Sequence, residues 1–265
     1  MTGTSQRAVI FVEPSLPSAL RPSDPSPGYA SDGRAVLSPG IAWRPPVKRG
    51  EVYEAALSRP AIIGIIDGYF EVTPTVWHKE ILWAMAREIY VYGSASIGAL
   101  RAAELHTFGM VGIGRIFEAY RDGILTDDDE VAVLHGPEEL GYPVLTEAMV
   151  NIRATLDKAV AEGVIDSVAV TRLTERGRYL FYKERSWDAI LQLAAGHDPL
   201  PRLAGFVAWL QRRQVDQKRI DGLEMIATIR AHLAAGVRPL TVSYRFHDTG
   251  YHRAAARQSA LTPKL

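Results

Sequence analysis

The apolar residues in the N-terminal part of the chain fall into three short runs. They are AVIFV at 8–12, PAIIGII at 60–66 and the stretch at 89–92. Each run is short, rich in β-branched side chains and bounded by turn residues, which is the pattern of a buried β-strand. Residues 14–46 are rich in proline, serine and glycine, so they predict a long irregular insert with one short strand near 35–37.

Helical spacing of apolar residues follows the second and third runs. Thr73 and Pro74 predict a helix start, with threonine as N-cap and proline in the first turn. Another helix is expected at 96–106. The alternation of strands and helices predicts an α/β fold with a small parallel sheet flanked by helices. Because parallel strands end at the same edge, we expect Asp67 and Ser94–Ser96 to share that edge.

The pattern becomes almost entirely helical after residue 114, apart from a possible strand at 131–134. We expect helices at 114–121, 146–162, 171–183, 187–195, 203–213 and 218–234. The chain therefore predicts an α/β core at 1–145, a largely α-helical region packed on it at 146–234, and a mobile tail at 235–265.

Composition removes several classes of function. The chain has 265 residues, of which 47% are hydrophobic, so it can bury a core. Lys plus Arg and Asp plus Glu number 30 each, which argues against nucleic acid or an anionic membrane as partner. We see no membrane-spanning apolar run and no signal segment, so the cytoplasm is the expected location. The absence of cysteine excludes disulfides, thiolate metal sites and a persulfide on this chain.

The stretch YGSASIGAL at 92–100 contains more serine than a helix cap needs. Ser96 has small neighbours and is followed by Gly98, a pattern similar to the nucleophile elbow, although Ser94 stands where an elbow has glycine. The helix that follows would offer amide donors to an oxyanion. Ser96 is therefore a candidate nucleophile, and the alternative is that it only caps the helix.

Polar residues on the flanking helices could assist such a serine. Lys79 could act as a base or bind an anion, and His78 could carry protons, unless both lie on a solvated surface. Arg101 and Glu104 are three residues apart and share a helix face. Arg101 could hold a carboxylate or thiocarboxylate, or could simply pair with Glu104.

Two other motifs are weaker. Asp127–Glu130 precede His135, but the spacing fits neither an EF-hand loop nor an HExxH helix, and a solvated turn is favoured over a metal site. The glycines within 109–114 match neither a dinucleotide fingerprint nor a P-loop, and they favour a loop that leads into a helix. We therefore assign no metal ligands.

Several long segments resemble those of one family, the TfuA family. The segments are FVEPSLP at 11–17, RPP and RGEVYEA within 44–55, IIGIIDGYFEVTPTVWHKEIL at 62–82, VYGSASIGALRAAEL at 91–105, FGMVGIGRIFEAYRDGILTDDDEVAVLH at 108–135 and LTEAMVNIRATL at 145–156. The resemblance is dense from 9 to 156 and looser to about 231.

This resemblance implies a role beside a YcaO-type ATP-dependent cyclodehydratase that installs backbone thioamides. The chain would release sulfide from the C-terminal thiocarboxylate of a ThiS-like sulfur carrier, for use on a ribosomally made precursor peptide. ATP and Mg would be bound by the YcaO partner, and no cofactor is expected on this chain. The absence of cysteine agrees with sulfur taken from a partner's thiocarboxylate.

In this context the candidate catalytic residues are Ser96, Lys79, His78 and Arg101, and the candidate substrate-binding residues are Asp67, Ser94 and Glu104. We expect Ser96 to attack after losing its proton to Lys79 or His78. In a second mechanism, Asp67 or His78 activates a water and no covalent intermediate forms. Two other functions stay open: a non-catalytic adaptor that docks carrier, peptide and YcaO enzyme, and a metal-dependent hydrolase that uses 127–135.

Overall fold

The computed structural model describes residues 8–21, 28–29, 35–36, 40–71, 73–195 and 203–250. The chain divides into two units. Residues 1–124 and 221–265 form the sheet unit, and residues 125–220, inserted between them in the sequence, form the helical unit. The predicted boundaries differ, because they assign 125–145 to the core and 221–234 to the helical region.

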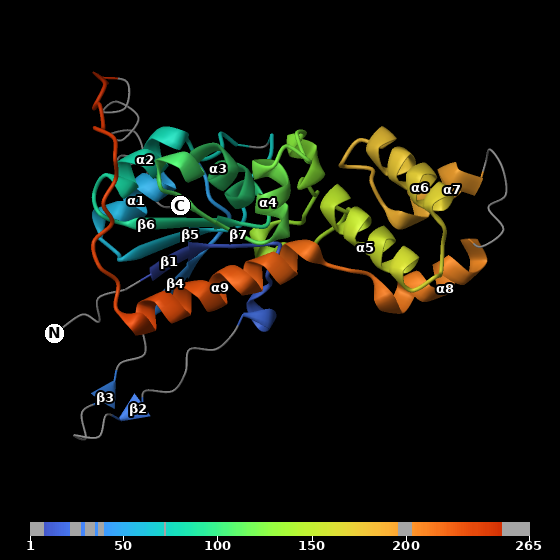
Figure 1. Cartoon of the computed structure of the whole chain (residues 1–265), viewed down its shortest axis with the longest axis horizontal. Helices are drawn as coiled ribbons and strands as arrows, with labels where there is room; N and C mark the ends of the chain where they lie inside the picture. Colours follow the sequence, from blue (N-terminus) through green and yellow to red (C-terminus); the bar gives the residue numbers. More distant parts are fainter. Residues whose placement is uncertain are drawn as a thin grey trace. The chain divides into compact units, whose positions relative to one another are not determined.

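A five-stranded parallel sheet is the centre of the sheet unit, as predicted (Figure 1). Its order is β4-β1-β5-β6-β7. The strands are β1 (Ala8–Phe11), β4 (Ile41–Arg44), β5 (Ile62–Ile65), β6 (Tyr90–Ser94) and β7 (Val111–Ile113). Strands β4 and β7 were not predicted. A separate antiparallel pair joins β2 (Gly28–Tyr29) to β3 (Ala35–Val36), which confirms the short strand near 35–37.

Helices cover both faces of this sheet (Figure 1). The first four are α1 (Glu51–Leu57), α2 (His78–Met85), α3 (Ile97–Leu105) and α4 (Arg115–Arg121). Helices α1 to α3 lie on one face, and α9 (Gln217–Ala235) runs across the other. Four apolar side chains of α9 join the strand residues in one core: Met225, Ile226, Ile229 and Leu233.

The predicted start of α2 is wrong by four residues. The helix begins at His78, and its N-cap Trp77 has an extended backbone. The carbonyl of Pro74 accepts a hydrogen bond from the Arg49 amide at 3.0 Å. The segment before the helix is therefore bonded to the loop that precedes α1. The fifteen residues after α9, 236–250, were predicted to belong to a mobile tail, yet Tyr244 donates to the Leu82 carbonyl at 2.6 Å.

The strand order creates a topological switch point between β1 and β5. The chain passes from β1 to β4 on one side and then returns to β5 on the other side. Open parallel sheets of this kind bind ligands at such a switch point. The site lies beyond the carboxyl ends of two neighbouring strands whose connections leave in opposite directions. The register places Phe11 beside Ile65 and Ile65 beside Gly93. Residues two positions further along these strands therefore reach the same edge at about the same level.

In the described part of the helical unit, four α-helices lie near four of the five helices predicted for the helical region. They are α5 (Met149–Ala161), α6 (Ser167–Tyr179), α7 (Trp187–Ala195) and α8 (Leu203–Arg213). Helix α6 begins four residues earlier than expected, because the Asp166 carboxylate caps it through the Ala169 amide at 2.9 Å. The expected strand at 131–134 is wrong, since that segment is irregular. The core of the unit includes Met149, Leu156, Leu173, Trp187, Ile190 and Phe206.

Candidate functional site

The start of α3 is pressed against the carboxyl edge of the sheet. A Cβ atom built on Gly98 would lie 1.8 Å from the Ile65 carbonyl oxygen, and one on Gly93 would lie 2.1 Å from the Gly98 carbonyl oxygen. The Gly98 amide also donates to the Ile66 carbonyl at 3.2 Å. Two glycines therefore fix the first turn of α3 between β5 and β6.

Ser96 occupies the N-cap position of α3 without acting as a side-chain cap. It is 3% exposed, and among the described residues its hydroxyl makes no hydrogen bond. The Ser96 amide donates to the Ser94 carbonyl at 2.8 Å around Ala95, whose φ is +65°. This is the strained form of a γ-turn. The strained residue is Ala95, one position before the serine that the elbow pattern singles out.

Ser94 and Asp67 reach the same edge, as predicted, but their polar groups are engaged within the protein. The Ser94 hydroxyl is fully buried and donates to the Ile113 carbonyl at 2.9 Å, which links β6 to β7. The Asp67 carboxylate accepts the amides of Glu13 and Ser15 at 3.0 Å each and the Ser15 hydroxyl at 2.6 Å. Asp67 therefore holds the loop that follows β1.

That loop carries a residue that was not predicted, Glu13. Its side chain is 9% exposed and forms an ion pair with Arg21 through Oε1. Its other oxygen, Oε2, is buried without a hydrogen-bond partner among the described residues. Burial raises the pKa of Glu13, Arg21 opposes this rise, and Asp67 adds to it. The available signal was an acidic residue placed directly after a buried strand.

Glu104 joins two of the predicted catalytic residues into one cluster. Its Oε2 lies 2.8 Å from His78 Nε2 and accepts a hydrogen bond from Arg101 at 2.6 Å. The Arg101 Nε donates to the Val76 carbonyl at 3.1 Å. Burial alone would raise the pKa of Glu104, but the hydrogen bonds from His78 and Arg101 outweigh it and lower that pKa. The cluster ties the start of α2 to α3.

Lys79 lies outside this cluster. Its Nζ is 5.5 Å from the ring centre of Phe246, a cation–π contact with the segment after α9. Within the described residues, no hydrogen bond joins Ser96 to Lys79 or His78. The roles predicted for these side chains stay predictions.

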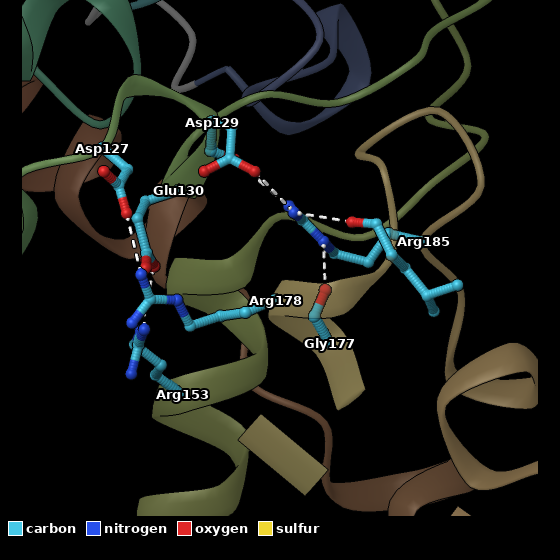
Figure 2. Close-up of polar contacts among 8 residues, drawn as sticks. Asp127, Asp129, Glu130, Arg153, Gly177, Arg178 and Arg185 are labelled. Carbon is cyan, nitrogen blue, oxygen red and sulfur yellow. Dashed lines mark hydrogen bonds and ion pairs between the residues drawn. The ribbon is translucent and has the colours of Figure 1, made fainter. Parts of the chain in front are cut away.

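The acidic turn of the helical unit is neutralised by arginines (Figure 2). Asp127 pairs with Arg178 at 2.9 Å, Asp129 with Arg185 at 2.8 Å and Glu130 with Arg153 at 2.7 Å. Arg185 is fully buried, and its Nε donates to the Gly177 carbonyl at 2.9 Å. Across the described ranges, no group of three or more His, Cys, Asp or Glu side chains is arranged to hold a metal. The turn therefore joins segments of this unit.

The glycine-rich stretch at 109–114 contains β7 and leads into α4, in agreement with the predicted helix-entry loop. Asp221 caps α4 by accepting the Ile116 amide at 2.8 Å. A Cβ atom on Gly114 would lie 2.4 Å from the Asp221 carboxyl carbon. An internal carboxylate thus occupies the position where a nucleotide phosphate would bind a helix N-terminus.

The fold and this edge define a doubly wound α/β protein with a candidate site at the switch point and the neighbouring strand end. Residues 67–186 match the family model described as TfuA-like protein, so this segment of the chain is similar to that family. The resemblance seen in the sequence is thereby confirmed, and the match supports a role in the YcaO-associated thioamide system. No curated protein matches the chain. No helix in the described part is both long and apolar enough to cross a membrane.

Proposed function

We propose that this protein supplies sulfur for YcaO-dependent thioamide formation by hydrolysing the C-terminal thiocarboxylate of a ThiS-like carrier. The observation that carries the proposal is the unpaired hydroxyl of Ser96 at the start of α3. The hydroxyl neither caps α3 nor bonds another described residue, so it is free to meet an incoming group. An incoming acyl group would be its partner.

The surroundings of Ser96 suit acyl transfer. The amides in the first turn of α3 and the positive end of the helix dipole favour the developing oxyanion. Gly93 and Gly98 keep that turn rigidly on the sheet, so these donors are positioned before the substrate arrives. The hydroxyl then attacks the thiocarboxylate carbon, hydrosulfide leaves, and water hydrolyses the acyl-serine.

The remaining components lie on other proteins in this proposal. The carrier brings sulfur as a thiocarboxylate, the YcaO-type cyclodehydratase binds ATP and Mg and activates the peptide backbone, and the precursor peptide receives the sulfur. Because the chain contains no cysteine, sulfide passes on as a released product and not as a persulfide of this protein.

The test uses the purified full chain and a thiocarboxylated carrier. We expect sulfide release without the YcaO enzyme, and we expect Ser96→Ala to reduce it strongly. Mass spectrometry of the quenched reaction should detect the acyl-enzyme in the unsubstituted protein. Undiminished release by Ser96→Ala would leave the hydrolase role intact but would replace the serine nucleophile by an activated water.

The adaptor role is a second candidate function, favoured by a separate observation. The segment 134–145 folds back on itself through the His135–Val144 bridge and exposes large apolar side chains. Leu134, Leu140, Val144 and Leu145 are 36%, 71%, 53% and 58% exposed. Exposed apolar groups of this kind suit a protein partner. If the isolated chain releases no sulfide, but the YcaO enzyme needs this chain for thioamidation, the adaptor role is the better explanation.

A further inference from the structure

Glu13 has one carboxylate oxygen in an ion pair and one without a partner in the described part of the chain. Arg21 pairs with Oε1, whereas Oε2 is buried and has no hydrogen-bond partner in the described part of the chain. Nearly all buried polar atoms of folded proteins have a partner, so an exception needs a reason such as a ligand or a catalytic role. The 9% exposure of the side chain leaves one margin of the group open to solvent.

The protein fixes Glu13 in place through its backbone. The Glu13 amide donates to the Asp67 carboxylate at 3.0 Å, and the Ser15 amide and hydroxyl bind the same carboxylate. The φ of Glu13 is +117°, a value that a residue with a side chain rarely adopts. Strained backbones of this kind concentrate at functional sites, because the surrounding contacts must enforce them.

Register places Glu13 and Ser96 on the same edge. Phe11, Ile65 and Gly93 are level across β1, β5 and β6. Two residues further along, Glu13 and Ala95 flank Asp67, and Ser96 follows Ala95. Strands lie about 4.8 Å apart, so Glu13 and Ser96 are roughly 10 Å apart at their backbones. A thiocarboxylate bound beyond the carboxyl end of β5 would therefore lie between these two residues.

We propose that Glu13 is the proton donor that turns the thiocarboxylate sulfur into a leaving group at this site. The inference rests on the proposed function and adds a proton donor, which the mechanism proposed there does not include. A thiocarboxylate is an anion, so it resists attack by an oxygen nucleophile until its charge is neutralised. A carboxylic acid in a desolvated position can supply the necessary proton.

Protons and electron pairs balance over the whole reaction. The Glu13 acid gives its proton to the sulfur, which converts the thiocarboxylate to a thioacid and leaves Glu13 ionised. The Ser96 oxygen forms a bond to the carbonyl carbon, the C–S bond breaks, and the sulfur takes the electron pair and the hydroxyl proton to leave as hydrogen sulfide. Water then hydrolyses the acyl-serine, giving the carboxylate and a proton that restores the Glu13 acid.

The environment of Glu13 agrees with this role. Burial and the nearby Asp67 carboxylate raise the pKa of Glu13, so its acid form persists to a higher pH than that of an ordinary glutamate. The acid form is the active one, so sulfide release should decline as pH rises through this raised pKa. Arg21 limits the rise of the pKa, which keeps the group able to release its proton.

The experiment measures sulfide release by the full chain from a synthetic peptide that ends in a glycine thiocarboxylate. We expect Glu13→Gln to lower the rate by about 10²- to 10⁴-fold, the usual contribution of a positioned proton donor. Whatever rate is left should no longer decline across that pH range. Glu13→Asp should recover part of the rate. Glu147→Gln is the matched control, because burial also raises the pKa of Glu147, which belongs to the helical unit.

A binding experiment separates this inference from the proposed function. With Ser96→Ala, the affinity for the thiocarboxylate peptide should fall as Glu13 ionises, and the double variant with Glu13→Gln should lose that pH dependence. If the unsubstituted chain releases no sulfide but the pH-dependent binding is found, hydrolysis fails as a function and Glu13 still binds the sulfur as a proton donor. Unchanged rate and pH profile in Glu13→Gln, or pH-independent or absent binding, would overturn the inference.

Discussion

Gly98 in α3 and Ile65 in β5 approach so closely that no side chain fits between them. A Cβ on Gly98 would be 1.8 Å from the Ile65 carbonyl oxygen, a backbone atom that cannot rotate away. We expect Gly98→Ala to lower the free energy of unfolding by about 3 kcal/mol, at the upper end of overpacking costs, since helix and sheet must separate. Urea denaturation followed by circular dichroism measures this loss.

Gly205 in α8 provides the control for that substitution. A Cβ there meets no atom within 4 Å, and the residue is exposed. Gly205→Ala should therefore stabilise the protein by up to about 1 kcal/mol through helix propensity. Equal stability changes in the two variants would mean that the contact between α3 and β5 is looser than described.

Replacing the serine at the start of α7 should affect stability, whereas replacing the serine at the start of α3 should affect activity. Ser186 caps α7, since its hydroxyl accepts the Ala189 amide at 3.2 Å, whereas Ser96 makes no such bond at α3. Ser186→Ala should cost about 1 kcal/mol of stability and keep sulfide release, and Ser96→Ala should lose release with little change in stability. Thermal unfolding and a sulfide assay on both variants test this; a large loss of stability in Ser96→Ala would make Ser96 a structural residue.

Among the arginines at the acidic turn, replacing Arg185 should lower the free energy of unfolding most. It is fully buried and bonded to Asp129, Gly177 and Leu180. Arg185→Met leaves these acceptors without a donor, and we expect a loss of about 3–5 kcal/mol in the free energy of unfolding.

Arg178→Met is the control for this variant, because the Arg178–Asp127 pair has side chains that are 57% and 52% exposed. The loss in free energy of unfolding of Arg178→Met should stay below about 1 kcal/mol. Chemical denaturation of both variants gives the comparison. Similar small losses would mean that Arg185 is not buried in solution.

Glu80 should make stability depend on pH. It is 4% exposed, and burial raises its pKa above the ordinary value of 4.5, although the backbone amides that it accepts oppose this. The folded state therefore binds this proton more tightly than the unfolded state. The resulting stabilisation is complete below pH 4.5 and is lost as pH rises through the raised folded pKa.

Glu80→Gln removes this titration. The difference in unfolding free energy between the unsubstituted protein and Glu80→Gln should therefore fall across that pH window, by about 1.4 kcal/mol per unit of pKa shift. Urea denaturation at a series of pH values measures it. Parallel stability curves for the two proteins would contradict the buried position of Glu80.

Local pattern was sufficient for those parts of the fold that have strong periodicity. The runs that became β1, β5 and β6 and most helices were predicted, because burial dictates their spacing. Strand β7 is three residues long and lies among glycines, so it has no strand pattern of its own and forms by pairing with β6. The start of α2 was placed too early because Thr73–Pro74 is a good local cap, whereas the Glu80 carboxylate accepts the amide of the N-cap residue Trp77 at 3.1 Å and favours a start at His78.

The candidate site was predictable only in its outline. The strand ends placed Asp67, Ser94 and Ser96 on one edge, which the parallel sheet confirms. Partners were not predictable, because each depends on a tertiary contact: Ser15 for Asp67, Ile113 for Ser94 and His78 for Glu104. Glu13 was missed because the position of β1 next to β5 arises from the strand order, which short-range pattern does not encode.

Helix α9 gives the protein an order of assembly. Ile229 and Leu233 fill the core beneath strands that are made more than 130 residues earlier, since β6 ends at Ser94. On the ribosome, one face of the sheet therefore stays uncovered until the whole helical unit has been synthesised. Contacts over such sequence distances slow folding and expose apolar surface in the meantime. A chain that stops before α9 should accordingly need a chaperone, or aggregate, however well its helical unit folds.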